Sequence, residues 1–138
     1  MSVRKGDRSE GKLQVLNKAR ILKIYSIERA KTFPKSTRWI YAAPVVNEIR
    51  SACTSIRHAN SVHFPSEYPK DNEYRRREQI TAHANLDALL DLIDDAYTAH
   101  YISGEQLDHW TGLVVEADEL LKAWIKSDAA KLKDKETK

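Results

Sequence analysis

Apolar residues recur along this chain in alternating steps of three and four, with polar residues between them. This spacing places apolar side chains on one side of an α-helix, where they can pack against neighbouring helices. Three segments share it, and their apolar positions are Trp39, Ala42, Val46, Ile49, Cys53 and Ile56; Leu86, Leu90, Ile93 and Tyr97; and Leu107, Trp110, Val114, Ala117, Leu121 and Trp124. The pattern predicts an all-α fold in which these residues, including all three tryptophans, face a shared core.

Residues that stop or cap helices divide the chain into four predicted helices. The first covers residues 12–31 and ends before Pro34, and its apolar stripe consists of Leu13, Leu16, Ala19, Leu22, Ile24 and Ile27. The others are expected from a cap at Ser36 or Thr37 to about residue 60, from about residue 70 to 100, and from a capping box of Ser103 and Gln106 to about residue 131. Four such helices with short connections predict an antiparallel up-down-up-down four-helix bundle.

The predicted bundle covers residues 12–131. Residues 1–11 are expected to form a flexible N-terminus, and residues 132–138 a charged disordered tail, because both are polar and lack an apolar stripe. Pro44 falls inside the second helix and leaves two alternatives. It either kinks that helix, or it starts the regular part of the helix after a looser turn.

Composition suits one domain with its own core: 138 residues, of which 41% are hydrophobic. The single cysteine, Cys53, excludes an internal disulfide, and its place among the apolar positions predicts a small buried side chain. Residues 1–12 lack the apolar segment of a secretory signal, and no stretch approaches the roughly 18 apolar residues of a membrane span. These features predict a soluble cytoplasmic protein that does not enter a membrane.

Charge is distributed unevenly along the chain, although the net charge is only +3. Residues 1–80 hold 17 Lys and Arg against 8 Asp and Glu, a net charge of +9, whereas residues 81–138 hold 6 against 12, a net charge of −6. This asymmetry indicates either a polyanionic partner or self-association through opposite faces. The alternative is that helices of unequal charge simply pair within one bundle.

Basic residues of the first two helices and the start of the third are the candidates for contacts with phosphate. They are Lys18, Arg20, Lys23, Lys35, Arg38, Arg50, Arg57, Arg75, Arg76 and Arg77. Such sets of Lys and Arg bind a nucleic-acid backbone without reading its sequence. Because the tryptophans are expected in the core, binding would follow charge and shape rather than stacking on bases.

Patterns of catalytic or metal-binding residues are largely missing. A di-iron bundle needs Glu-x-x-His pairs, and no Asp or Glu here is followed by His three residues later. The acidic residues Asp87, Asp91, Asp94 and Asp95 are expected on a solvated face. We therefore expect no enzyme, no cofactor and no metal site.

One short pattern offers an enzymatic alternative. Arg57 followed by His63 resembles the Arg-x(4–6)-His motif of HEPN-type endoribonucleases, and Arg76 and Arg77 with His83 fit the same spacing. The resemblance would make His63 the acid/base and Arg57 the phosphate-binding cation in metal-independent RNA cleavage.

A broader resemblance covers about residues 13–127. Residues 33–39 (FPKSTRW) resemble the Phe-Pro-Lys-x-x-Arg-aromatic turn of the small "four helix bundle proteins", which include proteins encoded in intervening sequences of bacterial 23S rRNA genes and the accessory variability determinant (Avd) proteins of diversity-generating retroelements. Residues 84–90 (ANLDALL), 101–103 (YIS) and 120–126 (LLKAWIK) match the same group in order and spacing. The Ser-Ile-Pro-x-Asn-Ile-Ala-Glu-Gly signature of the rRNA-linked branch is absent, which favours the Avd-like branch.

The resemblance implies a four-helix protomer that assembles as a ring-like homopentamer. Avd proteins bind the reverse transcriptase and the template RNA of their retroelement and support mutagenic cDNA synthesis without being catalysts. We therefore expect a non-enzymatic accessory protein that binds RNA and a reverse transcriptase. The alternative is an oligomeric protein-interaction scaffold that does not bind RNA.

Overall fold

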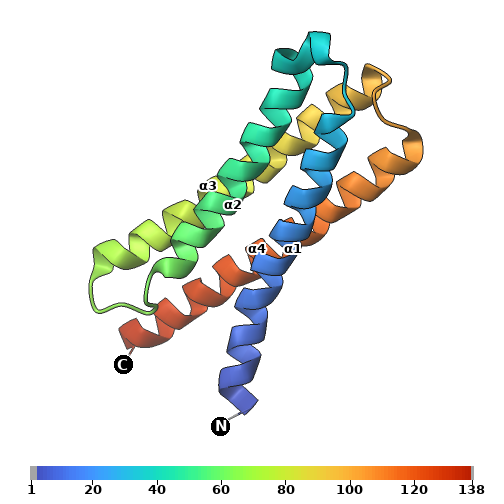
Figure 1. Cartoon of the computed structure of the whole chain (residues 1–138). Helices are drawn as coiled ribbons and strands as arrows, with labels where there is room; N and C mark the ends of the chain where they lie inside the picture. The colour runs from blue at the N-terminus through green and yellow to red at the C-terminus, as the bar shows by residue number, and fades with distance from the viewer. Residues whose placement is uncertain (1–2, 138) are drawn as a thin grey trace.

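The computed structural model describes residues 3–137 of the chain, and side chains from residue 14 to residue 136. This part is all-helical, which confirms the predicted all-α fold (Figure 1). Its elements are α1 (Val3–Lys31), the 3₁₀ turn η1 (Lys35–Thr37), the π-helical turn η2 (Arg38–Ala42), α2 (Ala43–Ser61), α3 (Pro69–Thr98) and α4 (Gly104–Thr137).

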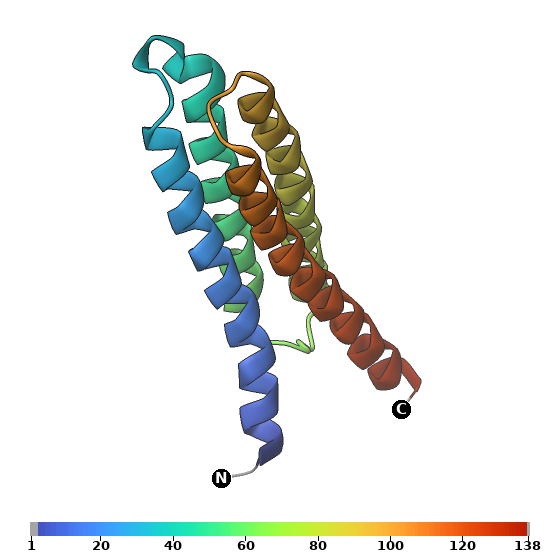
Figure 2. The same cartoon turned by 90° about the vertical axis from the view of Figure 1, so that its right-hand side faces the viewer.

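Each long helix packs against two others. Helix α1 lies against α2 and α4, and α3 lies against the same two helices. The connections from α1 to α2 and from α3 to α4 lie at one end of the molecule, and the α2–α3 connection lies at the other (Figures 1 and 2). The core is enclosed between the four helices, and Leu22, Ile49, Leu86 and Trp110 are among its large, fully buried side chains.

The apolar line predicted on α4 faces the core. Trp110, Val114, Ala117 and Leu121 are buried, and the indole Nε1–H of Trp110 donates a hydrogen bond of 2.8 Å to the buried Ser26 Oγ of α1. A buried indole is stabilised when its N–H finds such a partner. On this helix the periodicity alone located the core side chains.

On α2 the buried residues match the predicted apolar positions only in part, and the first predicted residue lies outside the core. The buried residues are Val45, Ile49, Ala52, Ser55, Ile56 and Ala59. Trp39 is 80% exposed instead of buried, so the prediction that it belongs to the core is wrong. The reason is that residues 35–42 are wound as a tight 3₁₀ turn and a wide π turn, so their side chains do not continue the face of the α-helix that follows.

Pro44 stands in the first turn of α2, which begins at Ala43. Its missing N–H is harmless there, because the first N–H groups of a helix have no partner within the helix. This confirms the alternative in which Pro44 starts the regular helix after a looser turn.

The predicted cap at Ser36 or Thr37 is wrong: neither turn has a side-chain cap, and Thr37 Oγ1 instead donates to the carbonyl of Pro34.

On the remaining two helices, the row of buried residues is shifted to one side of the predicted apolar row. Helix α3 buries Arg75, Gln79, Ala82, Leu86, Leu89, Ile93 and Ala96, while Tyr97 is exposed. Helix α1 buries Val15, Ala19, Leu22, Ser26 and Ala30, while Ile24 is exposed. Both apolar stripes are wide, and the positions of the neighbouring helices decide which edge of each stripe is covered.

Two helices extend beyond their predicted limits. Helix α1 begins at Val3 rather than near residue 12, and α4 continues to Thr137 rather than ending near residue 131. Near the end of α4, Lys135 Nζ donates to the carbonyl of Ser66 over 2.9 Å, a tertiary contact that joins α4 to the loop before α3. Residues 1, 2 and 138 of the two predicted flexible ends lie outside the described residues.

The start of α4 carries the predicted capping box. The backbone N–H of Ser103 donates to Gln106 Oε1 over 2.9 Å, and the N–H of Gln106 donates to Ser103 Oγ over 3.1 Å. These two bonds satisfy donors that a helix start leaves without partners. Both hydrogen bonds of the predicted capping box are therefore present.

Helix α3 ends in a left-handed residue that is not glycine. His100 has a φ of 65°. Its N–H donates to the carbonyl of Tyr97, and the N–H of Tyr101 donates to the carbonyl of Ala96, which is the pair of bonds of a Schellman motif.

We expect His100→Gly to raise the free energy of unfolding by about 0.5–1 kcal/mol, because glycine relieves the Cβ strain but also loosens the unfolded chain. Urea denaturation measures this, and His100→Ala, which keeps the Cβ, is the control. A loss of stability in the glycine variant would contradict the prediction.

Candidate nucleic-acid interface

An open groove of about 770 Å³ runs between α1 and α2. Helix α1 lines it with Leu16, Asn17, Ala19, Arg20 and Lys23, and α2 lines it with Cys53, Ile56, Arg57, Asn60 and Ser61. Its floor is therefore apolar and its walls carry cations, amides and a hydroxyl. We call it the basic groove.

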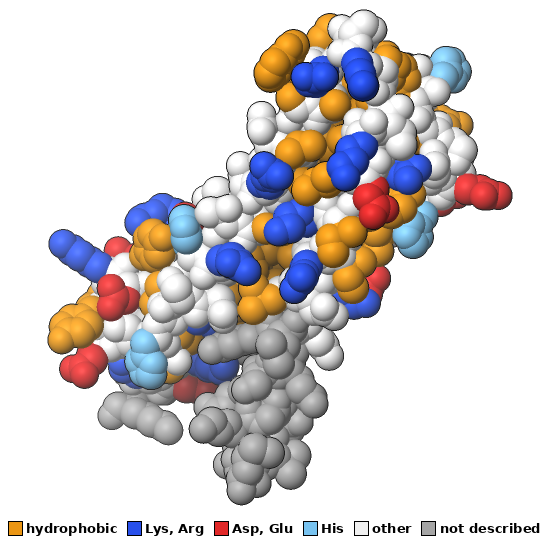
Figure 3. Space-filling model, viewed as in Figure 1, with side chains coloured by type: hydrophobic (Ala, Val, Ile, Leu, Met, Phe, Trp, Pro, Cys, Tyr) orange, Lys and Arg blue, Asp and Glu red, His pale blue; other side chains and the backbone are white. Residues whose placement is uncertain are grey.

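Three of the predicted phosphate-binding residues meet at the basic groove. Arg20 and Lys23 are three residues apart on α1 and so share one side of that helix, and Arg57 approaches from α2. None of the three forms an ion pair with any other side chain within residues 14–136. Figure 3 shows Lys and Arg side chains spread over this face, with few carboxylates among them. The groove therefore presents positive charge that the described chain leaves uncompensated.

Cys53 lies in the groove and takes part in its electrostatics. Its thiol donates a 3.6 Å hydrogen bond to the carbonyl of Ala19. Burial raises the pKa of the Cys53 thiol, and the nearby charges of Lys23 and Arg57 act in the opposite direction without reversing the shift. A thiol that stays protonated is a poor nucleophile, so Cys53 packs the groove floor rather than supplying chemistry.

Two other predicted residues of the first two helices lie outside the groove lining. Lys18 Nζ lies 2.6 Å from Glu116 Oε1, so its charge is directed to α4 and compensated there. Arg50 is exposed on α2, two helical turns before Arg57, and forms no ion pair with the side chains of residues 14–136. Arg50 can extend the positive face along α2, whereas Lys18 cannot.

The remaining predicted cations lie at the two ends of the bundle. Lys35 and Arg38 are exposed on the turns η1 and η2, beside Trp39. Arg76 and Arg77 are exposed near the start of α3, and the guanidinium of Arg77 lies 5.8 Å from the centre of the Tyr74 ring. Neither pair lines the basic groove, so the ten predicted residues do not form one site.

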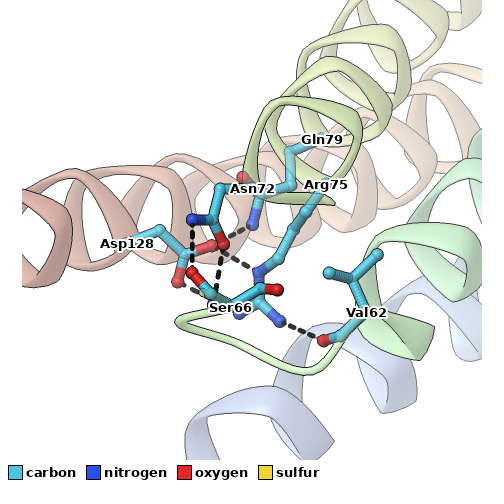
Figure 4. A network of polar contacts seen from close by, with 6 residues as sticks. All are labelled: Val62, Ser66, Asn72, Arg75, Gln79 and Asp128. Atoms are coloured by element: carbon cyan, nitrogen blue, oxygen red, sulfur yellow. Dashed lines mark hydrogen bonds and ion pairs between the residues drawn. The ribbon is translucent and has the colours of Figure 1, made fainter. Parts of the chain in front are cut away.

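Arg75 is the clearest correction to the predicted set, because it is 1% exposed and cannot reach an external phosphate. Its Nε and Nη2 donate to the two carboxylate oxygens of Asp128 on α4, over 2.6 and 3.0 Å (Figure 4). Its guanidinium also lies 4.4 Å from the ring centre of Phe64 and 4.8 Å from that of Trp124. Arg75 is therefore a structural ion-pair partner.

The same network fixes the loop between α2 and α3. Arg75 Nη1 donates to the carbonyl of Val62, and Gln79 Nε2 donates to Asp128 Oδ2 over 2.9 Å. Ser66 exchanges two hydrogen bonds with the side chain of Asn72 (Figure 4). A signal for this network existed in the sequence, because Arg75 and Gln79 continue the helical spacing of Ala82 and Leu86 toward the start of α3.

The acidic residues of α3 are solvated, as predicted. Asp87, Asp91, Asp94 and Asp95 are all exposed. The positive charge of the basic groove therefore belongs to α1 and α2, and much of the negative charge to α3 and α4.

Of the two spacings that resemble the endoribonuclease motif, the first crosses the end of α2 and the second lies within α3. Helix α2 ends at Ser61, so Arg57 is on the helix and His63 is exposed in the loop that follows. In the other pair of arginines with a histidine, His83 Nδ1 is hydrogen-bonded to Asp118 Oδ1 over 2.7 Å. This contact gives His83 a structural partner on α4.

Within the described chain, no three side chains of His, Cys, Asp or Glu gather as metal ligands would. None of the described helices is long and apolar enough to span a membrane.

Compared with known proteins, the chain matches no family model, no curated protein and no solved structure at a significant level.

Proposed function

We propose that this chain is a non-enzymatic accessory protein that binds RNA in the basic groove. The observation that carries the proposal is the convergence of Arg20, Lys23 and Arg57 on one groove without an ion pair among the described side chains. Cations that no carboxylate compensates release condensed counterions from a phosphate backbone when they bind it, which favours association.

The groove chemistry favours contacts with the backbone over recognition of bases. No aromatic side chain of the described residues lines the groove, and the exposed indole of Trp39 lies outside it, on the η2 turn. Stacking on aromatic rings is the usual means of holding unpaired bases. Binding here should therefore depend strongly on salt and weakly on sequence.

The sequence resemblance supports a more specific assignment within this proposal. The turn at residues 33–39 and the segments over 84–90, 101–103 and 120–126 favour an Avd-like protein of a diversity-generating retroelement. On this reading the protein acts in the cytoplasm, folds as an up-down-up-down bundle, forms a homopentamer, and binds the reverse transcriptase together with the template RNA. A reverse-transcriptase gene with template and variable repeats beside the gene for this chain would support the assignment.

A charge-neutralised groove tests the proposal directly. We expect the variant Arg20→Gln, Lys23→Gln, Arg57→Gln to bind a labelled single-stranded RNA oligonucleotide at least tenfold more weakly at low salt. The slope of log K against log salt should fall by about 2, because each lost phosphate contact removes about 0.7 from it. Filter binding over a salt series measures both quantities.

The matched control removes the same charge elsewhere. Arg76→Gln, Arg77→Gln, Lys126→Gln changes three exposed cations outside the groove and leaves the net charge of the two variants equal. The control should retain most of the affinity. Equal losses in both variants, or wild-type binding that does not vary with salt, would contradict a site in the groove.

The scaffold function remains the second proposal, and one observation favours it. Trp39 and Ile40 are 80% and 67% exposed, as expected for a surface that a protein partner covers. A purified protein that assembles but does not retain RNA at low salt would favour the scaffold over the RNA-binding accessory.

A further inference from the structure

The end of the bundle formed by η1 and η2 presents an aromatic ring to solvent, with cations beside it. Trp39 and Ile40 are the two most exposed large apolar side chains of the described residues, and they are neighbours. Lys35 and Arg38 are exposed on the same two turns, and neither forms an ion pair with the side chains of residues 14–136. We call these four residues the tip.

The turns that carry Trp39 are fixed by contacts with the rest of the bundle. Thr37 Oγ1 and Tyr101 Oη are hydrogen-bonded over 3.3 Å, and Tyr41 meets the Tyr101 ring edge-on with centroids 4.9 Å apart. The buried Phe33 lies on the other side of the turns, with its ring centroid 5.5 Å from that of Tyr101. The exposed indole therefore stands on a preformed support, which lowers the entropy cost of binding a ligand there.

Positive charge continues from the basic groove to the tip. Arg57 of the groove and Arg50 are exposed on α2 two helical turns apart, and α2 begins at Ala43, directly after η2. Figure 3 shows Lys and Arg side chains over the α1–α2 face as far as the end of the bundle at which η1 and η2 lie. From Arg57 to Ala43 the helix rises by about 21 Å. At the spacing of about 3.4 Å in a stacked strand, about six nucleotides cover this path.

We propose that the tip holds an unpaired base of an RNA strand bound in the basic groove, and that the base stacks on the indole of Trp39. This inference rests on the proposed RNA binding and adds a preference for single-stranded RNA. A base within a duplex is already stacked and paired, so Trp39 cannot reach its face. Any unpaired base has such a face, so the contact tolerates different sequences. Lys35 and Arg38 can meet the phosphates next to the stacked base.

The charges of the tip favour this occupant over a protein partner. The cores of protein interfaces are depleted of charged residues. An indole between Lys35 and Arg38, two cations without ion pairs among the described side chains, instead suits a ligand that combines flat rings with negative charges. Single-stranded RNA is such a ligand.

A strand without bases tests the stacking contact. An RNA of about 12 nucleotides, twice the length of the path, is compared with an abasic strand of equal length and charge. We expect the wild type to bind the RNA about 5- to 100-fold more tightly, which is the contribution of one base stacked on an aromatic side chain. Trp39→Ala should lose most of this preference and keep the wild-type slope of log K against log salt. Filter binding over a salt series measures both quantities.

Two further variants separate stacking from apolar burial. Ile40→Ala is the matched control, because it removes a similarly exposed apolar side chain from the next position. It should keep the preference for RNA over the abasic strand. Trp39→Phe retains an aromatic face and should keep most of the preference as well. Equal losses in Ile40→Ala and Trp39→Ala would overturn the stacking contact.

Fluorescence shows directly whether the ring of Trp39 is covered. Trp110 is fully buried and Trp124 is half-buried, so the difference in emission between wild type and Trp39→Phe reports on Trp39. We expect acrylamide to quench this component in the free protein and RNA to protect it, whereas the abasic strand should not. A Trp39 ring already protected in the absence of RNA would show that another protein chain covers the tip, and would overturn the proposal.

Failure of this inference is distinguishable from failure of RNA binding in the groove. Equal, strongly salt-dependent binding of RNA and the abasic strand by wild type would overturn the stacking contact and leave the groove in place. The basic-groove variant should instead have a reduced salt slope and still prefer RNA over the abasic strand, because the tip is unchanged. A wild type that binds no RNA at low salt would overturn both proposals.

Discussion

Replacing Arg75 with methionine is expected to lower the free energy of unfolding by about 3–5 kcal/mol, the cost of removing one partner from a buried ion pair. The side chain of Asp128 is 7% exposed and would lose the bidentate guanidinium that compensates it. The carbonyl of Val62 would lose a donor as well. Chemical denaturation, followed by circular dichroism, measures the change.

A double-mutant cycle separates the ion pair from the other roles of Arg75. We expect Arg75→Met with Asp128→Leu to cost clearly less than the sum of the two single changes, because the double variant leaves no uncompensated charge. Arg76→Met is the matched control, since Arg76 is the exposed neighbour on the same helix and should change stability by less than about 0.5 kcal/mol. Additive losses would show that the two charges do not interact.

Replacing Trp110 with alanine is expected to cost about 3–5 kcal/mol, the range for large aromatic side chains in a packed core. Trp110 is fully buried and contacts the Tyr25 ring edge-on with centroids 6.0 Å apart. Its loss would open a cavity and leave the buried hydroxyl of Ser26 without its indole donor. Unfolding in urea, followed by circular dichroism, should show a midpoint at much lower denaturant concentration.

The same substitution at Trp39 is the natural control. Trp39→Ala removes an identical side chain from a position that is 80% exposed, so the loss should stay within about 0.5 kcal/mol. Both variants are compared at low protein concentration, where association contributes little to apparent stability. Similar losses at the two positions would mean that Trp39 is covered within its own chain.

Local patterns were sufficient to predict the elements of this protein. The apolar periodicity, Pro34, and the capping box of Ser103 with Gln106 identified four helices and their order, because these signals act over one or two helical turns. They failed where the backbone departs from α-helical winding. Trp39 fits the spacing of α2, yet the π turn before Ala43 directs it to solvent.

The candidate site, too, could be predicted only in part from the sequence. Charge counts indicated a basic half of the chain, and three of the ten predicted residues meet in the basic groove. The helical spacing of Arg75 with Gln79 and Ala82 distinguishes it from Arg76 and Arg77, but its partner Asp128 lies 53 positions further along the chain and only the tertiary structure identifies it.

The sequence by itself determined four amphipathic helices and an unequal distribution of charge, since periodicity and composition are properties of neighbouring residues. Only the tertiary structure decided which charges are paired and which remain available. That choice depends on contacts between helices far apart in the chain, such as Lys18 with Glu116 and Arg75 with Asp128. Arg20, Lys23 and Arg57 are left without ion pairs among the described side chains because the α1–α2 packing turns them toward the groove between these helices.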